Sequence, residues 1–305
     1  MTGQGPILKG GALALGNFDG VHRGHAALVA TTIAAARTKG IPARVMTFEP
    51  HPRAVLNPDA PPFRLTSSAT RESLLRRLGV DEVITLPFTP EFSQLSAQDF
   101  AARVLRETYG AQQVLAGTDF VYGSKRSGNM QVLSDDLAPY GVEVTPVPLA
   151  MGDGGESLSS SHVRKALQEG DIATATRVLG RRWSIAGKVK AGAGRGRVIG
   201  VPTANLTLGD YLRPRYGVYA VKASRTGEAL AYRGVANIGV RPTVDGKTEL
   251  LEVHLFDFSE DIYGQEWEIS LEAFLRAEQA FPSLDALKTQ IIKDMAVARA
   301  TLGVT

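Results

Sequence analysis

The pattern of apolar residues changes once along this 305-residue chain, near Trp183, and that change limits the folds it can adopt. Before Trp183, short apolar runs alternate with stretches of helical periodicity. Strands that are separated by helices pair in parallel, so this half predicts a doubly wound α/β sheet, in which ligands bind at the carboxyl ends of the strands. The expected strands are residues 11–15, 43–48, 82–86, 113–116 and 143–147.

After Trp183, apolar and polar residues alternate with a period of two, and Gly, Pro and Asn separate the runs. This pattern predicts a mainly antiparallel β-barrel or sandwich, followed by a helix over residues 284–302. The apolar stripe of that helix, which we expect to face the core, is Leu284, Leu287, Ile291 and Met295. We therefore predict two domains, residues 1–180 and 181–305.

The composition excludes several classes of protein. The chain has no cysteine, so it forms no disulfide and offers no thiolate nucleophile or metal ligand. No apolar run approaches the ~18 residues that span a bilayer, and no secretory leader is evident. The net charge is +3, and basic residues alternate with acidic ones instead of clustering as in nucleic-acid-binding surfaces. We expect a soluble cytoplasmic protein that binds neither membranes nor nucleic acids.

The run GNFDGVHRGH, Gly16–His25, lies between the first expected strand and a helical stretch. Glycines let a ligand approach the backbone, and a helix start presents unpaired N–H groups to anions, so this turn predicts a phosphate site. His22 and His25 are three residues apart, so on a first helical turn both imidazoles face one side. The candidate nucleotide-binding residues are Gly16, Asn17, Phe18, Asp19, Gly20 and Gly24. The simpler interpretation is that the histidines cap the helix and that Asp19 only forms a turn.

The HxGH element resembles that of the nucleotidyltransferase superfamily, and the longer run is similar to its FAD synthetase branch. The resemblance implies that His22 and His25 hydrogen-bond the triphosphate of ATP and the charge that develops on its α-phosphate. This role is physically reasonable, because adenylyl transfer needs positioning and charge stabilisation more than a covalent residue.

A second run, LSSSHVRKAL, resembles the ISSTxIR element of the same enzymes. It places Ser160, Ser161 and Arg164 at a helix start, where hydroxyls, amides and a guanidinium can bind phosphate. The chain departs from the pattern in two ways: Ser161 stands where threonine is usual, and His162 precedes the valine. Ser161 still provides the hydroxyl group that threonine would. A helix N-cap would explain the serines alone.

The segments FEPHP (48–52) and AGTDFVYGSKRSG (116–128) also resemble loops of FAD synthetases. By that resemblance, an FMN pocket is lined by Asp119, Phe120, Arg164 and Asp171. His51 is equally consistent with a turn residue.

The run GAGRGRVIGVPTANL, residues 192–206, is the second glycine-rich candidate. Gly194, Gly196 and Gly200 suit a loop that folds over phosphates. If the chain runs extended after Pro202, Thr203 and Asn205 point to one side, and two neutral oxygen ligands suit Mg²⁺ that also binds nucleotide phosphates. The PTAN element and its glycines resemble riboflavin kinases.

Phosphorylation of riboflavin requires a base for the ribityl hydroxyl, and the resemblance marks Glu252 for this role. On the strand LEVHLF, Glu252 shares a face with His254 and Phe256, so the simpler interpretation is the solvated face of a half-buried strand. We expect His254 to be structural and leave Arg241 open. Arg276 and Glu278 are candidates for the border of the flavin pocket.

Together the two halves resemble the family of prokaryotic bifunctional riboflavin kinase/FAD synthetases. That resemblance implies that ATP and riboflavin give FMN, that ATP and FMN then give FAD and pyrophosphate, and that both steps require Mg²⁺. Two alternatives stay open: one activity has been lost, or the chain is a nucleotide-sensing or nucleic-acid-binding module. An aromatic content of 7% argues against the second alternative. The oligomeric state is left open.

Overall fold

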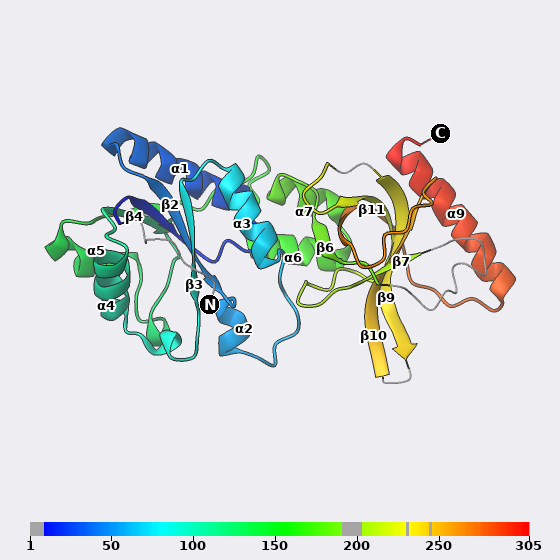
Figure 1. The fold of residues 1–305 in the computed structure, drawn as a ribbon, viewed down its shortest axis with the longest axis horizontal. Coiled ribbons are helices and arrows are strands. Elements are labelled where there is room, and N and C mark those ends of the chain that lie inside the picture. The colour runs from blue at the N-terminus through cyan, green and yellow to red at the C-terminus, as the bar shows by residue number, and fades with distance from the viewer. Residues whose placement is uncertain (1–8, 191–202, 230–231, 244–245, 305) are drawn as a thin grey trace. The chain divides into compact units, whose positions relative to one another are not determined.

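The computed structural model describes residues 9–190, 203–229, 232–243 and 246–304, with only the backbone at 241–243 and 246–248 (Figure 1). The chain forms two compact units. The first consists of residues up to 61 together with 68–158, and the second consists of residues 62–67 together with those from 159 onward. The predicted Gly194, Gly196 and Gly200 lie outside the described residues.

The first unit contains a five-stranded parallel sheet, as the sequence predicts (Figure 1). Its strand order is β3-β2-β1-β4-β5. Its strands are β1 (Ala12–Leu15), β2 (Ala43–Glu49), β3 (Glu82–Pro87), β4 (Gln113–Gly117) and β5 (Glu143–Val147). Its helices are α1 (Arg23–Lys39), α2 (Pro52–Leu56), α3 (Ser68–Arg77), η1 (Phe92–Gln94), α4 (Ala97–Asp99), the π-helix η2 (Phe100–Thr108), η3 (Ser124–Arg126), α5 (Met130–Leu137) and η4 (Ala138–Tyr140).

Alternate residues of each strand pack into two separate hydrophobic cores, because successive side chains of a strand point to opposite faces of the sheet. On one face, Ala12 and Ala14 pack with α1 residues such as Val29. On the other face, Leu13 and Leu15 pack with η2 and α5. Helices therefore cover both faces of the sheet, which confirms the doubly wound prediction.

The strand order reverses between β1 and β4, because β2 and β3 lie on one side of β1 while β4 and β5 lie on the other. This switch point is where open α/β sheets bind ligands. The loop after β1 is the GNFDGVHRGH run, and the loop after β4 carries Asp119 and Phe120. The FEPHP segment follows β2. The three loops of this unit that the sequence marks as candidate ligand-binding segments thus follow three neighbouring strands.

The second unit is a nearly closed antiparallel barrel with the strand order β6-β11-β8-β9-β10-β7. A bridge between Lys190, just after β6, and Asn205 joins the two ends of this order. Its strands are β6 (Ser184–Lys188), β7 (Ala204–Thr207), β8 (Gly217–Arg225), β9 (Tyr232–Thr243), β10 (Gly246–Leu255) and β11 (Glu266–Ala277). The predicted barrel is confirmed.

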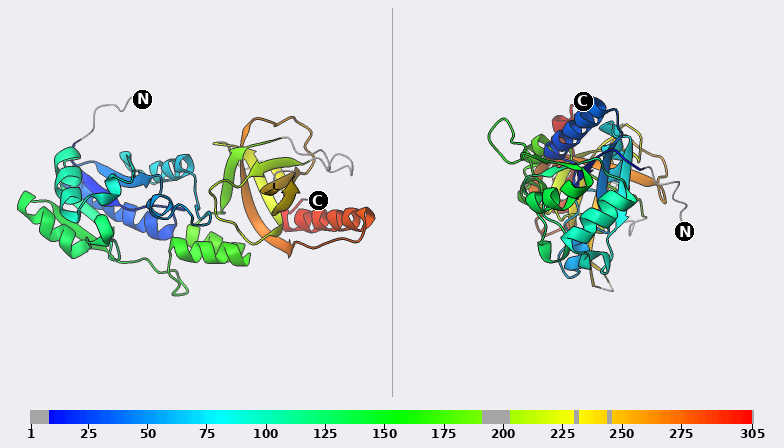
Figure 2. Two further views of the ribbon diagram at one scale, coloured as in Figure 1. Left: turned by 90° about the horizontal axis from the view of Figure 1, so that it is seen from below. Right: turned by 90° about the vertical axis from the view of Figure 1, so that its left-hand side faces the viewer.

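Among the described residues of this unit, the helices are α6 (Ser160–Glu169), α7 (Ile172–Leu179) and α9 (Leu284–Leu302). Figure 2 shows α9 alongside the strands, where Ala298 and Met295 pack against Val218 and Phe256. The prediction that Leu284 faces the core was wrong: its side chain is 55% exposed, because the buried face of α9 begins further along the helix.

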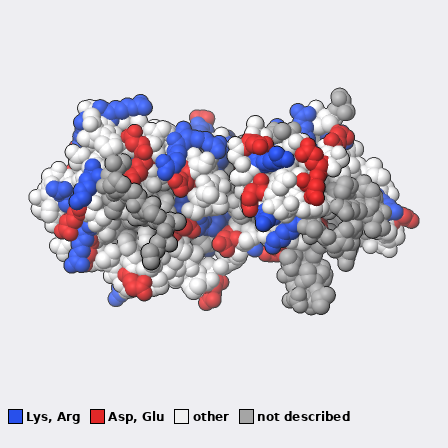
Figure 3. Space-filling model, in the orientation of Figure 1, with Lys and Arg blue, Asp and Glu red and all other residues white. Residues whose placement is uncertain are grey.

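The predicted domain boundary at residue 180 lies beyond α6 and α7, which pack with the second unit. That boundary was placed where the pattern of apolar residues changes along the sequence, and it stays a prediction. On the face drawn in Figure 3, basic and acidic side chains are interspersed. Among the described residues, no helix combines the length and apolar character that crossing a bilayer requires.

Candidate active sites

The loop after β1 has an unusual backbone. Phe18 and Val21 adopt the left-handed region, with φ of 51° and 40°, and Gly20 has φ of 85°. Non-glycine residues rarely adopt this region, and it persists where surrounding contacts fix the chain. The Phe18 ring is fully buried, and a Cβ at Gly16 would lie 3.0 Å from it. The loop is therefore fixed by packing, and Gly16 is needed for close approach.

His22 is the N-cap of α1, because its Nδ1 accepts a hydrogen bond of 3.2 Å from the backbone N–H of His25. This is the capping role that the simpler interpretation proposes, but it occupies only one ring nitrogen. An accepting Nδ1 carries no hydrogen, so a neutral His22 has its proton on Nε2, which is then a donor. The cap thus sets the tautomer that a phosphate ligand needs.

The imidazoles of His22 and His25 stack with their centroids 3.6 Å apart and their planes inclined by 21°. The ring of Phe18 packs 5.0 Å from that of His25. A Cβ at Gly24 would lie 2.5 Å from the carbonyl oxygen of Leu158 and 3.0 Å from the His22 ring. The histidines lie together as their spacing predicts, and Gly24 makes room for the His22 ring and the Leu158 carbonyl. Their contact with phosphate stays a prediction.

The two neighbouring loops present further polar and aromatic groups. His51 caps α2 by accepting the N–H of Arg53 at 3.1 Å, which matches its interpretation as a turn residue. Asp119 is exposed, and its Oδ1 lies 2.9 Å from where a Cβ would stand at Gly117. Phe120 is half-buried and stacks on Tyr122 at 5.8 Å. Burial raises the pKa of the Tyr122 hydroxyl, and the nearby Asp136 carboxylate raises it further, so this phenol stays neutral.

The second predicted phosphate element begins the second unit. The N-cap of α6 is Ser159, which accepts the N–H of His162 at 3.3 Å. Capping therefore does not account for Ser160 and Ser161, which lie in the first turn. The Arg164 Nε donates to the carbonyl oxygen of Phe63 at 2.9 Å. Phosphate binding by these residues stays a prediction.

Asp171 is the N-cap of α7, and its Oδ1 accepts the N–H of Thr174 at 2.9 Å. The hydrogen bond from the Thr174 backbone lowers the pKa of Asp171, since it stabilises the ionised carboxylate. This structural role accounts for the residue without a ligand, and flavin binding by Asp171 stays a prediction.

In the barrel, Glu252 on β10 pairs directly with Asn205 on β7 and with Asn237 on β9. Directly opposed residues share a face, so the three polar side chains form a row across three strands. Asn205 is only 4% exposed, whereas Glu252 and Asn237 are half-buried. Thr203 lies just before β7 and is half-buried. The row contains the predicted base and one predicted metal ligand.

The opposite face of β10 explains why Glu252 is the better candidate base. Leu251 and Val253 point into the buried interior. Glu249 shares their face and is tied to the Nε of Arg213 at 2.6 Å and to the hydroxyl of Tyr216. Burial raises the pKa of Glu249, but the hydrogen bonds from Tyr216 and Arg213 and the positive charge of Arg213 together lower it more, so the net pKa lies below the ordinary value. A carboxylate held in this way is a poor proton acceptor.

Two predicted flavin-binding residues lie against other groups of the second unit. Arg276 forms a bidentate pair with the buried Asp294 of α9, with Nε–Oδ1 at 2.9 Å and Nη2–Oδ2 at 2.6 Å. The Glu278 carboxylate occupies the space that a Cβ at Gly239 would need. Flavin contact by either residue stays a prediction, and Arg241 has no described side chain.

Sequence reasoning missed Asn237, although it lies in the part of the chain after Trp183 where alternation predicts strands. Asn237 is a candidate because the pairing of β9 with β10 places it directly opposite Glu252. The sequence alone does not fix the register of that pairing. Among the described residues, no group of three or more His, Asp or Glu side chains forms a metal site.

Two family models match the chain, one in each half. The model of FAD synthetase matches residues 5–162, and the model of riboflavin kinase matches residues 179–302.

Relatives match along nearly the whole chain. The bifunctional riboflavin kinase/FMN adenylyltransferase of Escherichia coli (strain K12) is 40% identical over 297 residues, which cover 97% of this chain and 94% of the relative. The protein of the same name from Bacillus subtilis (strain 168) is 38% identical over 287 residues, which cover 92% of this chain and 89% of the relative. A crystal structure described as a macrolide-efflux protein from Streptococcus pneumoniae has a TM-score of 0.83 and 34% identity, and the match covers 97% of this chain and 95% of that one.

Proposed function

The chain belongs to the family of bifunctional riboflavin kinase/FMN adenylyltransferases, and from its two sites we propose which residues carry each reaction. The enzyme phosphorylates riboflavin with ATP to FMN, and it adenylylates FMN with ATP to FAD and pyrophosphate. We assign FMN adenylyltransferase activity to residues 1–180 and riboflavin kinase activity to residues 181–305.

Adenylyl transfer takes place at the switch point of the parallel sheet. A phosphate oxygen of FMN attacks the α-phosphorus of ATP, and the bond to the β-phosphate oxygen breaks to release pyrophosphate. The nucleophile is already ionised, so the site needs donors and not a base. The Nε2–H of His22, fixed by the N-cap bond, and the imidazole of His25 stabilise the charge on the phosphates. The loop Gly16–Gly20 and Gly24 let ATP approach the backbone. On the resemblance of their own motif, we also assign phosphate binding to Ser160, Ser161 and Arg164.

Phosphoryl transfer takes place at the row on the barrel. The ribityl 5′-hydroxyl oxygen of riboflavin attacks the γ-phosphorus of ATP. The bond between the γ-phosphorus and the β-phosphate oxygen breaks, and ADP leaves. The hydroxyl proton passes to the carboxylate of Glu252, which acts as the general base. Asn205 and Asn237 flank this carboxylate and orient it.

Family members of both kinds use ATP with a divalent metal ion, and we propose Mg²⁺. The hydroxyl oxygen of Thr203 and the amide oxygen of Asn205 are hard ligands of the type Mg²⁺ prefers, and the buried position of Asn205 is suited to a fixed ligand. When bound, the ion neutralises phosphate charge and orients the γ-phosphate.

We further propose that Asp119, Phe120 and Asp171 contact FMN, and that Arg276 and Glu278 border riboflavin. The half-buried Phe120 ring, stacked on Tyr122, offers an aromatic face to an isoalloxazine ring. We assign both reactions to the cytoplasm, where their common substrate ATP is available.

The observation that carries the proposal is that one chain holds both the stacked imidazoles at the switch point and the Asn205–Glu252–Asn237 row. The test is a time course with purified protein, riboflavin, ATP and Mg²⁺, with the flavins separated by chromatography. FMN should appear first and FAD later, and a parallel incubation with FMN should give FAD directly. Riboflavin that stays unchanged would remove the kinase assignment, and FMN that accumulates without FAD would remove the adenylyltransferase assignment.

A further inference from the structure

Arg71 on α3 is one of the largest fully buried side chains of the first unit, at 1% exposure. A buried guanidinium is costly unless charge and hydrogen bonds compensate it, so its partners indicate what it does. It lies in none of the motifs described above.

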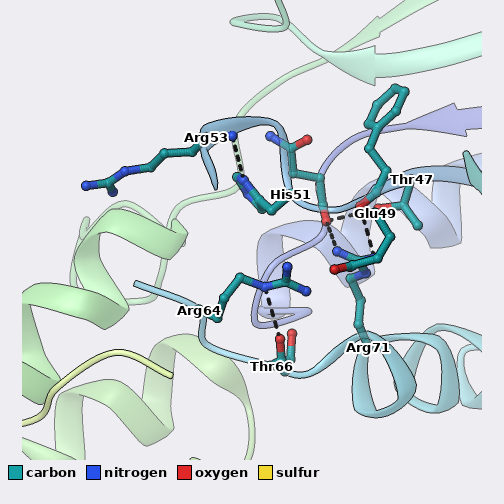
Figure 4. Close-up of polar contacts among 9 residues, drawn as sticks. Thr47, Glu49, His51, Arg53, Arg64, Thr66 and Arg71 are labelled. Carbon is teal, nitrogen blue, oxygen red and sulfur yellow. Dashed lines mark hydrogen bonds and ion pairs between the residues drawn. The ribbon is translucent and has the colours of Figure 1, made fainter. Parts of the chain in front are cut away.

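The guanidinium joins two neighbouring segments of the adenylyltransferase site (Figure 4). Its Nη2 donates to the Glu49 carboxylate at 2.8 Å and to the carbonyl oxygen of Phe48 at 3.1 Å, both at the carboxyl end of β2. Its Nη1 donates to the carbonyl oxygen of Asn17 at 3.4 Å, in the loop after β1. The hydroxyl of Thr47 donates to that same oxygen at 3.0 Å.

The peptide that these donors hold is the one that enters the left-handed part of the loop. Asn17 is followed at once by Phe18, whose φ is 51°, and the Phe18 ring packs 5.0 Å from that of His25. A shift of the Asn17 peptide would therefore move Phe18 and, through it, the imidazole pair. Backbone in this region keeps its geometry only when neighbouring groups fix it.

We propose that Arg71 is a positioning residue for adenylyl transfer. It fixes the loop 16–22 so that His22 and His25 meet the phosphates of ATP in the productive geometry. Arg71 acts through the loop and does not contact the reacting atoms. This inference rests on the proposed adenylyltransferase site and adds to it a residue that belongs to none of the recognised motifs.

The same unit contains a matched control near the other end of β2. Arg44 is also 1% exposed, its Nε pairs with Glu82 at 2.6 Å, and its Nη1 donates to the carbonyl oxygens of Gly10 and Tyr109 at 2.9 and 3.1 Å. Both arginines thus bind a carboxylate and backbone carbonyl oxygens. Only Arg71 does so at the carboxyl ends of the strands, where the site lies.

The experiment compares Arg71→Met with Arg44→Met in the full-length protein. For each variant the melting temperature, the kcat and KM for FAD formation, and the kcat for FMN formation are measured. We expect the two substitutions to lower the melting temperature by similar amounts, since each removes a buried guanidinium that pairs with a carboxylate. Arg71→Met should lower the kcat of adenylyl transfer roughly 100-fold, the scale of a misplacement of ~1 Å, while Arg44→Met keeps most of it. FMN formation should be unaffected in both.

Two milder variants keep the proposal testable if Arg71→Met does not fold. Arg71→Lys retains a cation for Glu49 and should recover part of the adenylyl kcat, and Thr47→Val removes the second bond to Asn17 with little change in shape. Equal adenylyl losses in the Arg71 and Arg44 variants, or full activity in both Arg71→Lys and Thr47→Val, would overturn the positioning role. Wild-type protein that forms FMN but no FAD would instead overturn the proposed adenylyltransferase site, and the positioning role with it.

Discussion

The two candidate sites are built from the chain in different ways. At the switch point of the sheet, the imidazoles and glycines come from one continuous run, 16–25, whose shape is fixed by packing under an irregular loop. On the barrel, Asn205, Glu252 and Asn237 come from three strands and meet only through register. A loop site depends on buried side chains that hold its backbone, whereas a register site is held by the ladder hydrogen bonds themselves. The first should be sensitive to distant supporting residues, and the second mainly to the residues in the row.

The largest effect is expected from Glu252→Gln, which keeps the shape of the side chain but removes its ability to accept a proton. General-base catalysis contributes 10²–10⁴-fold, so we expect FMN formation to fall roughly 1,000-fold. FAD formation from supplied FMN serves as the control in the same sample and should not change. An equal loss of both activities would show that the two sites are not separate, and an unchanged kinase rate would remove the base assignment.

The reverse result is expected from His25→Ala, which removes one donor from the imidazole pair. Loss of a single such donor costs roughly 100-fold in kcat, so FAD formation should fall by about that factor while FMN formation persists. His25 is preferable to His22 here, because His22 also caps α1 and its removal would combine a folding effect with a chemical one. Full adenylyl transfer in His25→Ala would discard the role of this imidazole.

The contrast between the two sites also explains how much could be predicted from the sequence. The parallel pairing of the first sheet followed from alternating strands and helices, and so did the place of the 16–25 run at the carboxyl end of its first strand. The strand order, which puts the loops after β1 and β4 next to each other, came only from the structure. The histidine pair followed from helical spacing alone. These inferences needed only local patterns and a general rule for α/β sheets.

What the sequence could not give are contacts between segments far apart in the chain. Asn237 and Glu252 become neighbours through the pairing of β9 with β10, and the pattern of alternation does not fix that register. Arg71 resembles any arginine of a surface helix until its carbonyl partners, in the loop after β1 and at the end of β2, are known. Leu284 shows the opposite error, because it continues an apolar stripe beyond the part of α9 that the barrel covers.

A smaller effect is expected from Asn237→Ala, which tests whether register alone makes a residue part of the kinase site. If its amide orients the Glu252 carboxylate, one hydrogen bond to a charged group is lost, which corresponds to a roughly 10-fold lower kcat of FMN formation. The KM for ATP and the rate of FAD formation should stay near their wild-type values. The informative control is Arg233→Ala, at an exposed position near the start of the same strand. Equal kinase rates in Asn237→Ala and Arg233→Ala would mean that the row needs only Glu252 and Asn205.

The smallest effect is expected at Asp171, where a cap and a proposed ligand coincide in one side chain. Asp171→Ala should lower the free energy of unfolding by about 1 kcal/mol, the usual cost of losing an N-cap, whereas Asp171→Ser keeps a capping oxygen and should lose only a few tenths. The hydrogen bond from Thr174 holds the folded-state pKa of Asp171 below 3.8. The ionised carboxylate therefore stabilises the fold above that pH, and the advantage of wild type over Asp171→Ser should disappear as the pH falls through the folded-state pKa. Denaturant unfolding at a series of pH values measures this. Because the Asp171 carboxylate already accepts a hydrogen bond from Thr174, we expect capping to be the larger contribution of this side chain. If Asp171→Ser keeps its stability but has a higher KM for FMN, the same carboxylate also binds flavin.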